Sequence, residues 1–163
     1  MKILKRIVIV MAALFVVLQF IRPPRNSAEA TSTNDITVKY SVPQDVQGIL
    51  HTSCFDCHSN STRYPWYAEI QPVGWFLNND IQNAKHDLNF SEFALYPARR
   101  QLAKLNGIID QVNEDEMPLP NYLTMHHDAK LTQEKKDKLV AWANAMIDTI
   151  KATYPPDSLL RRR

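Results

Sequence analysis

The hydrophobic positions of the chain form one continuous run near the amino end and spaced stripes in the remainder. Residues 7–21 are apolar except for Gln19, and Arg22 and two prolines follow them at once. From residue 41 onward, apolar residues recur three and four positions apart, and no segment shows a clear polar–apolar alternation. This spacing is typical of helices that bury one face. We therefore predict an all-α protein, with a hydrophobic amino-terminal helix followed by a small helical domain.

The first half of the domain is expected to hold two helices. One begins near Pro43, a residue suited to the first turn of a helix, and continues into Cys54. The second occupies residues 73–88. Residues 59–72 between them mix turn-forming residues with aromatic ones, so we expect an irregular connection there.

Two further helices are expected in the second half. The third carries an apolar stripe from Leu102 to Val112, and Ser91 is its candidate cap. The last begins after a Thr132 cap and ends before Pro155. Residues 117–131 between these two helices are predicted to form a proline-bearing loop.

Composition divides the chain into four segments and excludes several classes of protein. With 163 residues, 22% charged residues and two cysteines, the chain is too short for several domains, too apolar for a disordered protein and too poor in cysteine for a disulfide scaffold. The predicted segments are a signal anchor or signal peptide (1–25), a flexible tether (26–40), a small helical domain that contains both cysteines (41–154) and a disordered basic tail (155–163).

The positive charge lies mainly at the two ends of the chain. Residues 1–30 contain five basic residues and one acidic residue, whereas residues 31–163 contain fourteen basic and sixteen acidic residues. Three of these fourteen are the terminal run at 161–163. The body is therefore mildly acidic and shows no basic face, so we expect no nucleic-acid partner.

The amino-terminal run resembles an export segment, and either a cleaved signal or an anchor would fit it. Residues 7–21 would span ~22 Å as a helix, less than the ~30 Å hydrocarbon core of a bilayer. Residues 28–30 (AEA) offer a small-x-small cleavage site, but they lie nine residues beyond the run. We favour an uncleaved anchor through residues 7–21 in the inner membrane. The preceding positive charges would keep the short end in the cytoplasm and place the body on the periplasmic side.

The motif that carries chemistry is Cys54-Phe55-Asp56-Cys57-His58, which contains both cysteines of the chain. Two thiols one helical turn apart can add to the two vinyl groups along one edge of a porphyrin. The adjacent imidazole of His58 then lies under the iron as an axial ligand. We therefore predict covalent attachment of haem c through Cys54 and Cys57.

Other uses of the two cysteines are possible in principle and less favoured by the pattern. A thiol–disulfide exchange pair would need a thioredoxin-like βαβ setting, which the sequence does not show. A zinc site would need two more ligands, for which only His126 and His127 are available. A structural disulfide across so short a loop would constrain little.

The sixth position of the iron is assigned to Met117, which lies in the predicted loop fifty-nine residues after His58. A single methionine is usually core filling, but this one follows three acidic residues and precedes Pro118. The alternatives are His126 or His127, Met125, or an open position. Arg63 is expected to be an exposed arginine, with pairing to a haem propionate as its alternative.

Three segments resemble the haem-binding domain family of membrane-tethered bacterial c-type cytochromes, common in Bacteroidetes. They are residues 54–67 (CFDCHSNSTRYPWY), 88–93 (LNFSEF) and 116–120 (EMPLP). The resemblance covers roughly residues 41–150. It implies one covalent haem on Cys54 and Cys57, His58 as the proximal ligand and a cytochrome c-like helical fold, but it assigns no substrate.

We therefore expect a membrane-tethered monohaem cytochrome that passes single electrons to a periplasmic or membrane redox partner. We do not expect the chain itself to transform a substrate. The alternatives are a haem-based sensor or small-ligand binder, and a peroxidase-like enzyme with an open sixth position. The identity of the sixth ligand separates these functions.

Overall fold

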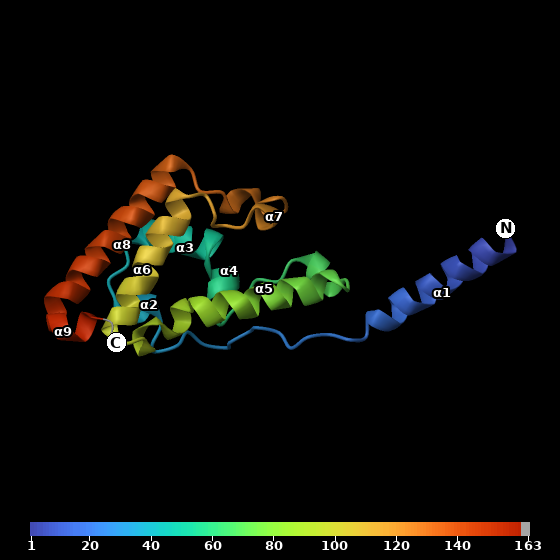
Figure 1. Cartoon of the computed structure of the whole chain (residues 1–163), viewed down its shortest axis with the longest axis horizontal. Helices are drawn as coiled ribbons and strands as arrows, with labels where there is room; N and C mark the ends of the chain where they lie inside the picture. The colour runs from blue at the N-terminus through green and yellow to red at the C-terminus, as the bar shows by residue number, and fades with distance from the viewer. Residues whose placement is uncertain (161–163) are drawn as a thin grey trace.

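The computed structural model describes residues 1–160, and this part of the chain contains helices and no strand beyond one isolated bridge between Ser27 and Ser61. The predicted all-α class is confirmed. Figure 1 shows helix α1 (Lys2–Leu18) projecting away from a body built of the remaining helices.

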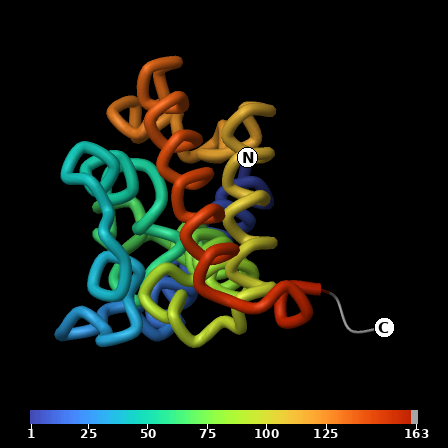
Figure 2. Tube along the Cα trace, turned by 90° about the vertical axis from the view of Figure 1, so that its left-hand side faces the viewer, coloured from blue at the N-terminus to red at the C-terminus, as the bar shows by residue number. Residues whose placement is uncertain are grey.

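The core lies where the two longest helices of the body pack together. Helices α6 (Ala98–Asn113) and α8 (Gln133–Thr153) run side by side, as Figures 1 and 2 both show. Helix α3 (Gln44–Ser53) packs on α8. The buried side chains of α8 recur on one face of the helix: Leu139, Trp142, Ala143, Met146, Ile147 and Ile150. This face closes the core against α3 and α6.

Of the two predicted side-chain caps, the structure confirms Thr132 and contradicts Ser91. The Thr132 side chain accepts a hydrogen bond from the backbone N–H of Lys135 and so caps α8 as predicted. Ser91 is not the cap of the third helix. It lies inside a short 3-10 helix, η2 (Phe90–Leu95), which the Asn89 side chain caps, and α6 begins only after Pro97.

The loop predicted at 117–131 contains two short helical turns, α7 (Pro120–Leu123) and η3 (His127–Ala129). Helix α5 (Val73–Asp87) closely matches the second predicted helix. After α8, residues Pro156–Leu159 form a further turn, α9, and Leu159 packs on the core. Residues 161–163 of the predicted tail lie outside the described part of the chain.

The segment 26–40, predicted to be a flexible tether, is packed against the body. The Asn26 side chain donates hydrogen bonds to the Ser59 carbonyl and the Thr62 hydroxyl at 2.9 and 2.8 Å. Ile36 is fully buried, and Asp35 caps the short helix α2 (Ile36–Lys39). The polar residues of this segment therefore supply caps and hydrogen bonds rather than a solvated linker.

The predicted hydrophobic helix at the amino end forms as α1, and none of its residues is buried. It has 17 residues, which corresponds to a length of ~25 Å against a bilayer core of ~30 Å. Within residues 1–160, no helix combines the length and apolar character that crossing a membrane requires.

Candidate functional site

The cysteine motif lies at the end of α3: Cys54 follows the helix, and Phe55–His58 form a single helical turn, α4. The backbone N–H groups of Cys57 and His58 both donate to the Cys54 carbonyl, at 3.2 and 2.9 Å. This turn holds the two thiols and the imidazole in one compact unit, which is the arrangement predicted from their spacing.

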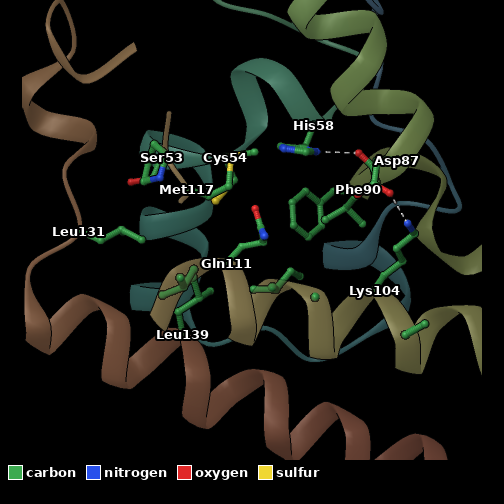
Figure 3. Close-up of a pocket in the computed structure, with 16 residues that line it drawn as sticks. Ser53, Cys54, His58, Asp87, Phe90, Lys104, Gln111, Met117, Leu131 and Leu139 are labelled. Atoms are coloured by element: carbon green, nitrogen blue, oxygen red, sulfur yellow. Dashed lines mark hydrogen bonds and ion pairs between the residues drawn. The ribbon is translucent and has the colours of Figure 1, made fainter. Parts of the chain in front are cut away.

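A cavity of about 400 Å³ lies between the end of α5, helix α6 and the turn α4. Figure 3 shows Cys54, His58 and Met117 around it, although Met117 comes from a distant part of the chain. Most of its remaining walls are apolar: Leu88, Phe90, Ile108, Val112, Leu131 and Leu139. Its size and lining are typical of a site for an organic ligand.

A second cavity of about 340 Å³ also has Cys54, His58 and Met117 in its walls. Cys57 and Tyr122 line this second cavity but not the first. The two spaces therefore meet at the cysteine turn, and together they expose both cysteines, the imidazole and the thioether to one interior region.

The His58 ring is oriented by the end of α5. Its Nδ1 atom lies 2.9 Å from the Leu88 carbonyl oxygen. Because a carbonyl only accepts, Nδ1 carries the proton and Nε2 keeps a free lone pair. Burial lowers the pKa of His58, which favours the neutral imidazole that binds metals.

The surroundings of the two thiols raise their pKa values. Burial and the neighbouring Cys57 raise the pKa of Cys54 to about 12, and burial with the charges of Asp56 and Asp80 raises the pKa of Cys57 to about 11. Both cysteines are free. Reactive exchange cysteines have lowered pKa values, so this environment argues against a thiol–disulfide function.

The residues considered for a zinc site do not assemble. His126 Nε2 lies 2.8 Å from the Tyr67 hydroxyl, and its ring stacks on Tyr122 with the centroids 4.2 Å apart. His127 is exposed. In residues 1–160, no cluster of three or more His, Cys, Asp or Glu side chains is placed to hold a metal ion.

Among the candidate sixth ligands, only Met117 faces the cavities. Its backbone N–H donates to the Gln111 carbonyl at 3.2 Å, so the end of α6 positions it. Met125 is 55% exposed. Neither Met125, His126 nor His127 lines either cavity in the described chain.

Helix α6 presents small residues to the larger cavity. Ala103 and Gly107 line it one turn apart. A Cβ atom at Gly107 would meet no atom within 4 Å, so open space lies directly in front of the helix backbone. A flat wall of this kind suits a planar ligand.

Charged side chains lie at two edges of this region. Lys104 Nζ pairs with Asp87 Oδ1 at 2.5 Å, and both residues line the larger cavity. Beside the cysteine turn, the buried Asp56 carboxylate accepts two hydrogen bonds from the Arg63 guanidinium and one from the Tyr122 hydroxyl at 3.0 Å. Arg63 is 67% exposed, as expected, and its guanidinium pairs with Asp56.

The family model for the haem-binding domain matches residues 13–145. The chain belongs to the haem-binding domain family. No curated protein and no solved structure matches the chain.

The residues present fit the haem that this family binds. The larger cavity combines apolar walls, an open face at Gly107, a nitrogen ligand with a free lone pair and a thioether. Sequence reasoning did not identify the Leu88 carbonyl, Gly107, Lys104, Asp56 or Tyr122 as parts of the site. Among these residues only Gly107 had a signal in the sequence, because a glycine interrupts the apolar stripe of a predicted helix there.

Proposed function

We propose that this protein is a monohaem c-type cytochrome that transfers single electrons. Cys54 and Cys57 hold the haem through two thioethers, His58 is the proximal ligand and Met117 is the distal ligand. Bound haem supplies a reversible one-electron couple, and Met/His ligation raises its potential. The chain itself contributes binding, ligation and burial.

The observation that carries this proposal is the convergence of Cys54, His58 and Met117 on one mostly apolar cavity. Cys54 and His58 are joined by a backbone hydrogen bond within one turn of the chain, whereas Met117 follows the carboxyl end of α6. Sequence spacing alone does not require that meeting. A nitrogen donor and a thioether facing a common space support a six-coordinate, electron-transferring site over an open one.

Individual side chains have distinct roles in this proposal. The Leu88 carbonyl fixes the His58 tautomer so that Nε2 is available. Lys104 supplies the one Lys or Arg side chain among the described residues lining either cavity. It pairs with the exposed Asp87 side chain, and a carboxylate of haem can take the place of that partner. The apolar residues keep water away from the site.

We also propose that the body works on the periplasmic side of the bacterial inner membrane, held there by the amino-terminal segment. The support is the apolar surface of α1, none of which is buried by the body, and the positive charge of its first turns. The partner is a periplasmic or membrane redox protein, and the acidic body favours a positively charged docking patch on it.

Spectroelectrochemistry of the purified protein tests the electron-transfer proposal. We expect one reversible one-electron couple, with low-spin spectra in both the ferric and ferrous states. A high-spin ferric spectrum would contradict the electron-transfer proposal and would favour a sensor or a peroxidase-like enzyme.

Fractionation of cells tests the location. The matured protein should remain in the membrane pellet after a salt wash, and a soluble periplasmic form would overturn the tethering.

A further inference from the structure

A cluster of exposed apolar side chains covers the end of the body nearest α1. It comes from the 3-10 helix η1 (Trp66–Glu69), from Ile70 directly after it and from the first turn of α5. We call it the tip surface, and its members with their exposed fractions are Trp66 (71%), Ile70 (38%), Val73 (41%) and Phe76 (68%). Exposed apolar residues usually occur singly on the surface of a soluble protein. Four of them within eleven positions therefore indicate an interaction surface.

The tip surface is joined directly to the end of α1. The Gln19 amide donates to the Gln71 carbonyl at 3.2 Å, and the Gln71 backbone N–H donates back to the Gln19 side chain at 2.8 Å. The Trp75 indole N–H donates to the Ile21 carbonyl at 2.8 Å. Figure 1 accordingly shows α1 leaving the body beside the start of α5. These bonds fix the last turn of α1 next to the tip surface.

The apolar character continues across this junction. Phe20 and Ile21 connect α1 to the body and are 82% and 57% exposed. Arg22 and Arg25 follow, and both pair with Glu69, which leaves a net positive charge beside the apolar residues. Aromatic residues next to basic ones are typical of protein surfaces at the boundary between lipid headgroups and acyl chains.

We propose that the tip surface docks on the surface of a bilayer containing anionic phospholipids. This inference rests on the proposed tethering at the membrane and adds to it a contact made by the folded body. A bilayer is favoured over a protein partner because a single apolar phase can take up the exposed residues of α1, Phe20, Ile21 and the tip surface together. A groove on a partner protein would need a shape complementary to both α1 and the tip surface.

Docking would set the height of the haem cavity above the membrane. Ala84 and Asp87 of α5 line the cavities and lie eight and eleven residues after Phe76. At the helical rise this is roughly 12 to 17 Å along α5. A docked tip surface therefore holds the cavity within a short distance of redox partners embedded in the membrane.

Binding of the full, haem-loaded chain to vesicles of phosphatidylethanolamine and phosphatidylglycerol tests the inference. The double variant Trp66→Ser/Phe76→Ser should lower the partition coefficient by roughly 10- to 100-fold, as expected for withholding two large side chains from an apolar phase. The matched control is Leu95→Ser, which removes a residue that is 63% exposed in η2, outside the tip surface. The control should bind like the wild type, and the haem spectrum verifies that each variant is folded.

A third variant separates this inference from the tethering on which it rests. Val10→Lys/Val17→Lys places charges on α1, where both residues are exposed. If this variant still binds like the wild type, the tethering by α1 is wrong. If it loses binding while Trp66→Ser/Phe76→Ser keeps it, the tethering stands and the docking of the tip surface is overturned.

Hydrogen exchange on the same vesicles gives an independent measurement. Backbone amides of residues 66–76 should exchange more slowly in the wild type on vesicles than in free solution, whereas those of residues 91–95 should be unchanged. Equal exchange in residues 66–76 with and without vesicles would also overturn the proposal.

Discussion

The imidazole Nδ1 of His58 lies 2.9 Å from the carbonyl oxygen of Leu88, the C-cap residue that follows α5. The last carbonyls of a helix have no partner within the helix, and here the cysteine turn supplies one. A single hydrogen bond therefore completes the end of α5 and sets the tautomer of the proposed proximal ligand. The bond links the motif to an element thirty residues away.

Free imidazole added to the solution should compensate for removal of the proximal imidazole of His58. In His58→Gly, we expect the low-spin spectrum to be lost, because the iron lacks its nitrogen ligand. Added imidazole should restore it, because the cavity retains space and the Leu88 carbonyl as an acceptor. Absorption titration measures the effect. His86→Gly is the control, since His86 is exposed on α5, and a similar spectral loss there would contradict the assignment.

The distal position is tested by a pair of methionine variants. Met117→Ala should abolish the Met-to-iron charge-transfer band near the red end of the visible spectrum and lower the midpoint potential, because Met/His ligation raises it. Met125→Ala should change neither, since Met125 is exposed and away from both cavities. A band that survives in Met117→Ala would show that another residue is the ligand.

Two glycines with open surroundings test the position of the haem. A Cβ atom added at Gly107 or at Gly48 would meet no neighbouring atom within 4 Å. Gly107 lines the larger cavity, whereas Gly48 is exposed on α3. Gly107→Phe should reduce haem content per chain severalfold by filling the cavity. Gly48→Phe should leave haem content unchanged, and equal haem content in the two variants would show that the cavity is not the site.

The Asp56–Arg63 pair should contribute to stability rather than to haem chemistry. In Arg63→Ala the buried Asp56 carboxylate keeps the Tyr122 hydroxyl but loses its charged donor, which should cost about 1–2 kcal/mol of unfolding free energy. Chemical denaturation followed by circular dichroism measures it. Lys138→Ala breaks exposed pairs with Asp45 and Glu134 and should have little effect. Comparable losses in both variants would contradict a special role for Asp56.

The helices of the body were largely predictable because their signals are local. The Thr132 cap and the apolar spacing of Leu139, Ala143 and Ile147 define α8 without any knowledge of the partners. Residues 26–40 were misinterpreted for the opposite reason. Their polar composition suggested a linker, but Asn26 and Ile36 gain their partners only from distant residues in the folded body.

The residues of the site also differ in how far the sequence alone could predict them. Cys54, Cys57 and His58 were predictable because one turn of the chain contains them, and their spacing has a chemical meaning. The Leu88 carbonyl and the pairing of Asp56 with Tyr122 depend on contacts across thirty and sixty-six residues. A backbone carbonyl has no residue type to reveal it in a sequence, so only the fold identifies it.

The central claim is that two thioethers join one haem to Cys54 and Cys57, and mass spectrometry of the denatured protein tests it most directly. Protein produced in a host that matures c-type cytochromes should have the mass of the chain plus one haem after acid–acetone extraction. Peptides spanning residues 54–58 should carry that haem. A bare chain with extractable haem, or a peptide in which the two sulfurs are bonded to each other, would contradict the account.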